Sequence, residues 1–101
     1  MAIRNGMRPV HPGEFLRDEM EAASVSEGAL SKALDVPLDR VTMILEGLQG
    51  VTADTALRLA RYFGTTPRLW LNLQQTWELR RAEIKVGPQI AKKVTPRKSA
   101  A

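Results

Sequence analysis

Apolar residues recur along this chain at helical spacing, and helix start and stop signals divide them into short segments. No stretch has the alternating β-branched pattern that is typical of strands. The first predicted helix begins at Pro12, a residue suited to the first helical position, and runs to about Ala23. Its apolar side carries Phe15, Leu16 and Met20. Its opposite side carries an acidic stripe at spacing i, i+4, i+7, made of Glu14, Asp18 and Glu21.

Residues 26–45 predict two short helices joined by a tight turn. Ser26, with Glu27 in the first turn, begins the first helix. Asp35 can adopt the left-handed conformation that a tight turn needs, and Pro37 then sets up the second helix. The predicted inward positions of the pair are Leu30, Ala33, Leu34, Val41, Ile44 and Leu45. This is the outline of a helix-turn-helix, whose second helix lies in the major groove of DNA.

Two further helices follow a loop that lies between two glycines, at 47 and 50. Thr52 with Asp54 begins the fourth helix, and Gly64 ends it. Thr66 and Pro67 provide the cap and first turn of the fifth, which we expect to end before Gly87-Pro88.

The sequence therefore predicts an all-α protein, a compact five-helix bundle. We expect three parts along the chain: an N-terminal arm over residues 1–10, a helix-turn-helix domain over residues 11–84, and a basic, disordered tail over residues 85–101. At 101 residues the chain is long enough for one domain with a modest core.

Composition excludes several classes of protein. The chain has no Cys, so it forms no disulfide and has no thiolate nucleophile or metal ligand. Its apolar runs are only a few residues long, and its N-terminus lacks the apolar core of a signal peptide. We expect a soluble cytoplasmic protein with no membrane partner.

The formal net charge of +4 is unevenly distributed. Residues 85–101 contain five of the fifteen basic residues and none of the eleven acidic ones, which leaves residues 1–84 at −1. The basic tail is most simply a solvated, mobile end. The alternative is that it binds phosphates without regard to sequence.

Four segments carry a resemblance to a known family. They are NGMRPVHPGEFLRDEM at 5–20, VPLDRVT at 36–42, GVTADTALRLARYFGTTP at 50–67 and WLNLQ at 70–74. In this order they resemble the HigA family of antitoxins, within the larger Xre/Cro-type helix-turn-helix group. The resemblance extends from about residue 5 to residue 82 and so covers most of the chain.

The resemblance implies a lambda-repressor-like helix-turn-helix fold and a homodimer. It also implies a RelE-like toxin partner that cleaves mRNA on the ribosome, and repression of the toxin–antitoxin operon through binding to double-stranded operator DNA. It implies no enzymatic activity. The residues agree, because His11 is the only histidine and no paired-carboxylate arrangement is evident. We expect a capping or loop role for His11, and no cofactor, metal or small-molecule ligand.

The second helix of the pair should expose the residues that touch DNA, which are Leu38, Asp39, Arg40, Thr42 and Met43. Arg40 is the best candidate for reading a base, because a guanidinium pairs bidentately with guanine O6 and N7. The alternative is a salt bridge from Arg40 to Asp39 or Glu46. Thr42 can contact a phosphate or a thymine methyl group.

Phosphate binding by side chains looks weak in this element. Glu27 stands where the family commonly has Gln, Asp35 replaces the usual turn glycine, and Leu48 and Gln49 replace commonly basic residues. Residues 26–50 have a net charge of −2. We therefore expect the backbone N–H groups at the helix starts near Ser26 and Thr52 to hold phosphates instead.

Two protein-binding surfaces are also predicted. The fifth helix carries an apolar face that we expect to help form a dimer interface, made of Leu69, Trp70, Leu73 and Trp77. Packing inside the monomer core is the alternative. A toxin that grips RNA should be basic, so the acidic stripe of Glu14, Asp18 and Glu21 is the candidate toxin-binding site. Solvated helix faces also have this pattern.

Two other functions remain open on the sequence. One is a stand-alone helix-turn-helix transcriptional regulator with no toxin partner. The other is a protein-binding module whose DNA surface has weakened, which the acidic residues of the helix-turn-helix favour.

Overall fold

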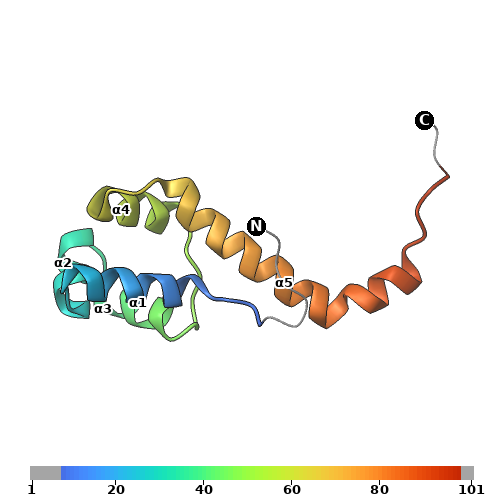
Figure 1. The fold of residues 1–101 in the computed structure, drawn as a ribbon, viewed down its shortest axis with the longest axis horizontal. Coiled ribbons are helices and arrows are strands. Elements are labelled where there is room, and N and C mark those ends of the chain that lie inside the picture. Colours follow the sequence, from blue (N-terminus) through green and yellow to red (C-terminus); the bar gives the residue numbers. More distant parts are fainter. Residues whose placement is uncertain (1–7, 99–101) are drawn as a thin grey trace.

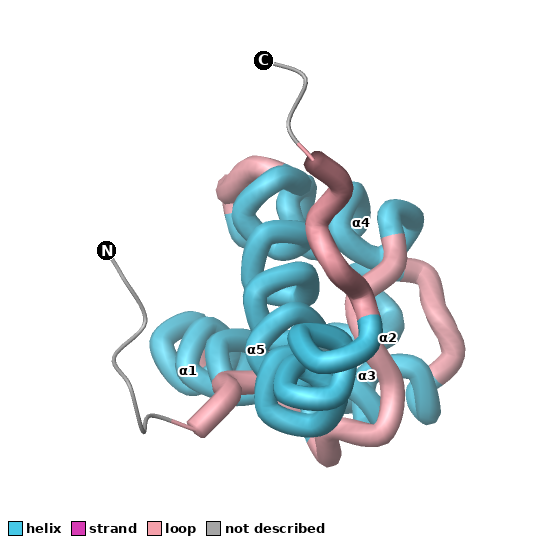
Figure 2. The backbone as a smooth tube through the Cα atoms, turned by 90° about the vertical axis from the view of Figure 1, so that its right-hand side faces the viewer, coloured by secondary structure: helices cyan, strands magenta, loops and turns pink. Residues whose placement is uncertain are grey.

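The computed structural model describes residues 8–98, and within that range it contains five α-helices and no strands (Figure 1, Figure 2). The helices are α1 (Pro12–Ala23), α2 (Glu27–Leu34), α3 (Leu38–Leu45), α4 (Ala53–Phe63) and α5 (Pro67–Lys93). The predicted all-α fold with a helix-turn-helix is therefore confirmed. None of the helices among the described residues is both long and apolar enough to cross a membrane.

The helix ends follow from local chemistry. Ser26, Thr52 and Thr66 each accept a hydrogen bond from a backbone N–H in the first turn of the helix that follows. Asp35 adopts the left-handed conformation (φ 57°, ψ 51°) between α2 and α3, as predicted. Gly64 ends α4 with φ 74°, which a residue without Cβ adopts at no steric cost.

Four helices and the first half of α5 form the body of the molecule, while the second half of α5 extends away from it (Figure 1). Within the body, α4 packs on α5 and α2 packs on α3. Contacts of α1 with α3 and α5, and of α2 with α4, close the bundle. The buried apolar core consists of Leu16, Met20, Leu30, Leu34, Val41, Ile44, Val51, Ala56, Leu59, Ala60 and Trp70.

Trp70 is the largest side chain in the core and is fully buried. Its ring meets Phe15 of α1 edge-on, with ring centroids 5.2 Å apart, and packs against Phe63 of α4 at 6.1 Å. Its indole Nε1 donates a 2.8 Å hydrogen bond to the hydroxyl of Thr65. The indole thus packs against two aromatic rings and has its one polar atom satisfied, as a buried Trp requires.

The predicted end of the fifth helix is wrong. Instead of stopping before Gly87-Pro88, α5 continues through Pro88 to Lys93, so residues 85–93 of the expected disordered tail are helical. A proline inside a helix removes one hydrogen bond and crowds the preceding turn, which bends a helix without always ending it. Figure 1 shows α5 changing direction in its second half. The residues after Pro88, QIAKK, include strong helix formers.

Parts of the two predicted ends lie outside the described residues, namely 1–7 of the arm and 99–101 of the tail. Residues 8–10 and 94–98 have no regular secondary structure. In the arm, Arg8 forms a bidentate ion pair with Glu14 of α1, with N–O distances of 2.7 and 2.8 Å.

Gly13 allows α1 to approach α3 closely. A Cβ built on Gly13 would overlap the backbone carbonyl oxygen of Ile44, near the C-terminal end of α3. Gly28 occupies the same second position of its helix, α2, but a Cβ there would meet nothing within 4 Å. The two glycines therefore have opposite roles, one needed for packing and one merely tolerated.

We expect Gly13→Ala to lower the free energy of unfolding by roughly 1–3 kcal/mol, the usual range for forcing extra volume into a packed site. Gly28→Ala is the matched control and should raise it by up to about 1 kcal/mol, because Ala loses less backbone entropy in a helix. Urea denaturation followed by circular dichroism measures both. A change of the same sign in both variants would contradict the close approach of α1 and α3.

Candidate nucleic-acid interface

The turn of the helix-turn-helix is held from outside by α4. Arg58 of α4 donates hydrogen bonds from Nη1 to the backbone carbonyls of Leu34 (2.8 Å) and Asp35 (3.1 Å), which end α2. These carbonyls lack partners inside the helix, so the guanidinium satisfies them. A side chain from a third helix thus holds the C-terminal end of α2, where the turn begins.

One side of α3 faces the core and the other faces solvent. Val41 and Ile44 are 2% and 1% exposed. Leu38 and Met43 are 52% and 37% exposed, and Asp39 is exposed as well. The predicted DNA-contacting residues of this helix therefore lie on its solvent side, with Arg40 and Thr42 half-buried at its edges.

Arg40 is not paired with Asp39 or Glu46, the salt bridges considered from the sequence. Its Nη1 instead donates a 2.9 Å hydrogen bond to Asp54, in the first turn of α4. Asp54 also accepts a 2.9 Å bond from Nε of Arg58 on the same oxygen. The bond from Arg58, and then that from Arg40, lower the pKa of the Asp54 carboxyl, so Asp54 is a stable anion between two cations.

Thr42 and Glu27 form a second link across the motif. The hydroxyl of Thr42 donates a 2.9 Å hydrogen bond to Oε1 of Glu27, at the start of α2. The carboxylate that was expected to weaken DNA binding therefore has a structural partner. It orients the threonine while keeping a second oxygen that accepts hydrogen bonds.

Ser26 and Thr52, the two predicted phosphate-binding helix starts, use their hydroxyls as caps. Ser26 Oγ accepts from the N–H of Ala29 (3.1 Å), and Thr52 Oγ1 accepts from that of Thr55 (3.3 Å). Both residues are exposed. Other first-turn N–H groups at these helix starts remain without intrahelical partners and are suited to binding a phosphate.

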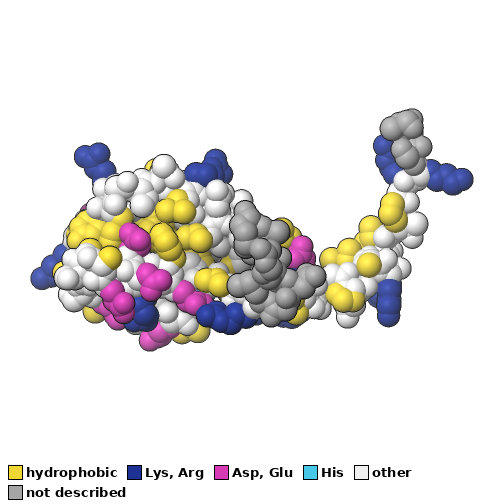
Figure 3. Space-filling model, viewed as in Figure 1, with side chains coloured by type: hydrophobic (Ala, Val, Ile, Leu, Met, Phe, Trp, Pro, Cys, Tyr) yellow, Lys and Arg dark blue, Asp and Glu magenta, His cyan; other side chains and the backbone are white. Residues whose placement is uncertain are grey.

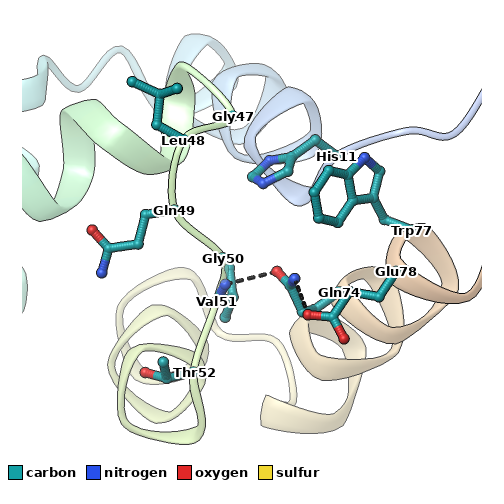
Figure 4. Close-up of a pocket in the computed structure, with 10 residues that line it drawn as sticks. All are labelled: His11, Gly47, Leu48, Gln49, Gly50, Val51, Thr52, Gln74, Trp77 and Glu78. Atoms are coloured by element: carbon teal, nitrogen blue, oxygen red, sulfur yellow. Dashed lines mark hydrogen bonds between the residues drawn. The ribbon is translucent and has the colours of Figure 1, made fainter. Parts of the chain in front are cut away.

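Gln49 lies in the loop after α3, which α5 anchors through Gln74 (Figure 4). The buried Gln74 accepts a 2.7 Å hydrogen bond from the N–H of Val51 through Oε1, and its Nε2 donates to Glu78 at 2.7 Å. A cavity of about 380 Å³ lies beside this loop. Its lining comprises His11, Gly47, Leu48, Gln49, Gly50, Val51, Thr52, Gln74, Trp77 and Glu78.

His11 lines this cavity and is the cap of α1. Its Nδ1 accepts a 2.9 Å hydrogen bond from the N–H of Gly13, and its ring meets Trp77 edge-on at 4.6 Å. Burial is the main cause that lowers the pKa of His11, which keeps the imidazole neutral. The predicted capping role is confirmed. Among residues 8–98 no group of three or more His, Cys, Asp or Glu side chains could hold a metal ion.

The predicted dimer residues have different surroundings. Trp70 is buried in its own core, so it offers no surface to a second copy, and for this residue the core alternative is correct. Leu69 and Leu73 are half-buried, and Leu73 packs against the core. Trp77 is half-buried, with the guanidinium of Arg81 4.9 Å from its ring centroid. An interface at Leu69, Leu73 and Trp77 stays a prediction.

The acidic stripe lies on the surface of α1, where Figure 3 shows acidic side chains gathered. Glu14, Asp18 and Glu21 are all exposed. The ion pair with Arg8 lowers the pKa of Glu14 and partly neutralises that end of the stripe. Asp18 and Glu21 form no hydrogen bond or salt bridge with the other described side chains, so their charge remains available to a partner.

Known proteins similar to this chain include solved antitoxins, although no protein-family model matches the chain. A solved antidote protein of the HigA family from Coxiella burnetii is 52% identical, with a TM-score of 0.86 over 89% of this chain and 99% of that one. Pseudomonas aeruginosa antitoxin HigA, solved with the higBA promoter, is 42% identical, with a TM-score of 0.86 over 89% and 99% of the two chains. Virulence-associated protein I of Dichelobacter nodosus is 47% identical over 81% of this chain and 77% of its own.

Proposed function

This chain belongs to the HigA family of antitoxins, and from that premise we propose that it neutralises a toxin and represses its own operon by binding operator DNA in the cytoplasm. Members of this family are not enzymes. The observation that supports DNA binding most directly is the solvent side of α3, where Arg40 and Thr42 are held in place by neighbouring helices. A relative of the same fold is solved with promoter DNA.

The first part of the proposal, operator binding, is tested with the DNA upstream of the protein's own gene. At ~100 mM salt, wild-type protein should shift this DNA in a gel and leave scrambled DNA unshifted at the same concentration. Arg40→Ala should weaken operator binding by about 5- to 150-fold, the value of one bidentate guanine contact. Arg68→Ala, which removes the same charge from the exposed start of α5, serves as the control and should have little effect. No shift by wild-type protein would favour a pure protein-binding module.

The second part of the proposal, toxin binding, concerns the acidic stripe. We infer that the partner is a basic, RelE-like toxin that cleaves mRNA, because an RNA-gripping protein is basic and complementary charge speeds association. Asp18 and Glu21 are exposed and unpaired among the described side chains, so they are better placed than Glu14 to attract it.

Charge reversal tests this surface. Asp18→Lys with Glu21→Lys should slow toxin association by about tenfold and make the association rate less dependent on salt, since steering acts through screened charges. Surface plasmon resonance against the toxin encoded beside this gene measures the rate at two salt concentrations. The control Glu46→Lys reverses an exposed charge at the end of α3. If the double variant behaves like this control, the stripe is not the toxin site.

A homodimer is the third part of the proposal, because helix-turn-helix proteins read two half-sites about one helical turn apart. The outer half of α5 carries an apolar stripe at i, i+3, i+7, i+11, which we call the α5 stripe: Leu79, Ala82, Val86 and Ile90. Leu79 and Ile90 are 62% and 51% exposed. A contiguous apolar face of this kind on a small protein suits a protein contact, and we assign it to a second copy. It is the alternative to an interface at Leu69, Leu73 and Trp77, which lie with Ile84 on another side of α5.

We expect Leu79→Glu with Ile90→Glu to convert the dimer to a monomer at micromolar concentration, because two charges would be buried without partners. The control Ile84→Glu changes an apolar residue that is 56% exposed on a different side of the same helix, and it should leave the dimer intact. Size-exclusion chromatography with light scattering gives the mass of each variant. A double variant that stays dimeric, or an Ile84→Glu monomer, would rule out the α5 stripe.

A further inference from the structure

We propose that Asp54 is a positioning residue that sets the base specificity of the Arg40 contact with DNA. The inference rests on the proposed operator binding and concerns how that binding discriminates among base pairs. The carboxylate of Asp54 lies 2.9 Å from Nη1 of Arg40, on a different helix from the one that carries the arginine. A residue that never touches a base would thus decide how selectively another residue reads one.

The geometry of the arginine supports this role. Only Nη1 of Arg40 is engaged by Asp54, and no hydrogen bond within residues 8–98 uses its Nε or Nη2. These two donors lie side by side on the other edge of a guanidinium, and such a pair matches O6 and N7 of guanine. Asp54 therefore restricts the long side chain to few rotamers without occupying the donors that a guanine needs.

Asp54 is itself held by Arg58. The 2.9 Å bond from Nε of Arg58 reaches the same carboxylate oxygen, while Nη1 of Arg58 is tied to the carbonyls at the end of α2. A chain of contacts thus runs from the turn of the helix-turn-helix through Arg58 and Asp54 to Arg40. Arg40 is 31% exposed in its side chain, less than Asp54 at 56%, as expected for an arginine that lies against α4.

The negative charge of Asp54 has a second effect on the binding of Arg40 to DNA. A loosely bound arginine attaches to any phosphate, which strengthens binding to all DNA and conveys no sequence information. Asp54 competes with phosphate for Arg40. Guanine carries no negative charge and can share the guanidinium with the carboxylate. The carboxylate therefore weakens sequence-independent binding more than it weakens the reading of a guanine.

The test begins with the operator position that Arg40 reads. Each G·C pair of the operator is replaced in turn. The position that Arg40 reads is the one whose replacement weakens operator binding by wild-type protein but not by the Arg40→Ala variant. The dissociation constant for the operator replaced at this position, divided by that for the intact operator, defines the discrimination. This ratio should be ~10-fold or more for wild-type protein. For Asp54→Ala we expect this ratio to fall by at least ~5-fold and binding to scrambled DNA to tighten by ~3- to 10-fold.

Two further variants separate positioning from charge. Glu46→Ala removes an equal charge from the C-terminal end of α3, where the carboxylate has no hydrogen-bond partner among the described side chains, and should tighten binding to every DNA without changing the ratio. Asp54→Glu keeps the charge but moves the carboxylate by one methylene group, and should lower the ratio while scrambled DNA binds as in wild type. Thermal unfolding checks that each variant is folded.

The outcomes are distinct. A wild-type ratio in Asp54→Ala, or an equal loss of discrimination in Glu46→Ala, would overturn the role of Asp54 while leaving operator binding intact. Wild-type protein that fails to distinguish its operator from scrambled DNA would overturn the proposed function, and the inference with it.

Discussion

The inner side of α3 is the constraint on which the rest of the molecule depends. An isolated helix of eight residues has little stability in water, so α3 keeps its shape only through tertiary contacts. Val41 and Ile44 supply buried apolar area, and the missing side chain of Gly13 lets α1 lie directly against the end of α3. These inner contacts therefore place the side chains on the outer surface of α3, which we propose contact DNA.

The acidic residues around α3 have structural roles that cannot be inferred from the net charge. Glu27 orients Thr42, Asp54 orients Arg40, and Asp35 forms the left-handed turn. Net charge measures how strongly this surface is repelled by DNA at long range. At contact distance, however, the carboxylates of Glu27 and Asp54 hydrogen-bond Thr42 and Arg40, the two groups that we propose read bases. On our proposal, weak sequence-independent binding and well-ordered reading groups are two results of one arrangement.

Sequence patterns predicted the helix starts and most helix ends because these depend on residues within one turn of each other, such as Thr52 capping α4. They failed at Pro88, since whether a proline bends or ends a helix depends on more than its neighbours. Sequence patterns also did not predict the hydrogen bonds between residues far apart in the chain. The Arg40–Asp54 pair spans fourteen positions and that of Val51 with Gln74 twenty-three, so only packing brings them together. The i, i+4 spacing of Asp54 and Arg58 was the one local signal available.

The two halves of α5 differ in their stability against local unfolding. Its first half carries Trp70 and Gln74 in the interior, whereas the half beyond Leu79 contacts few other described residues and contains Pro88. Amide hydrogens in the first half exchange with solvent only when the bundle opens, but those beyond it exchange through local fraying. A second chain bound to the outer half would slow that exchange. The outer half of α5 is thus the segment whose exchange rate reports on assembly rather than on folding.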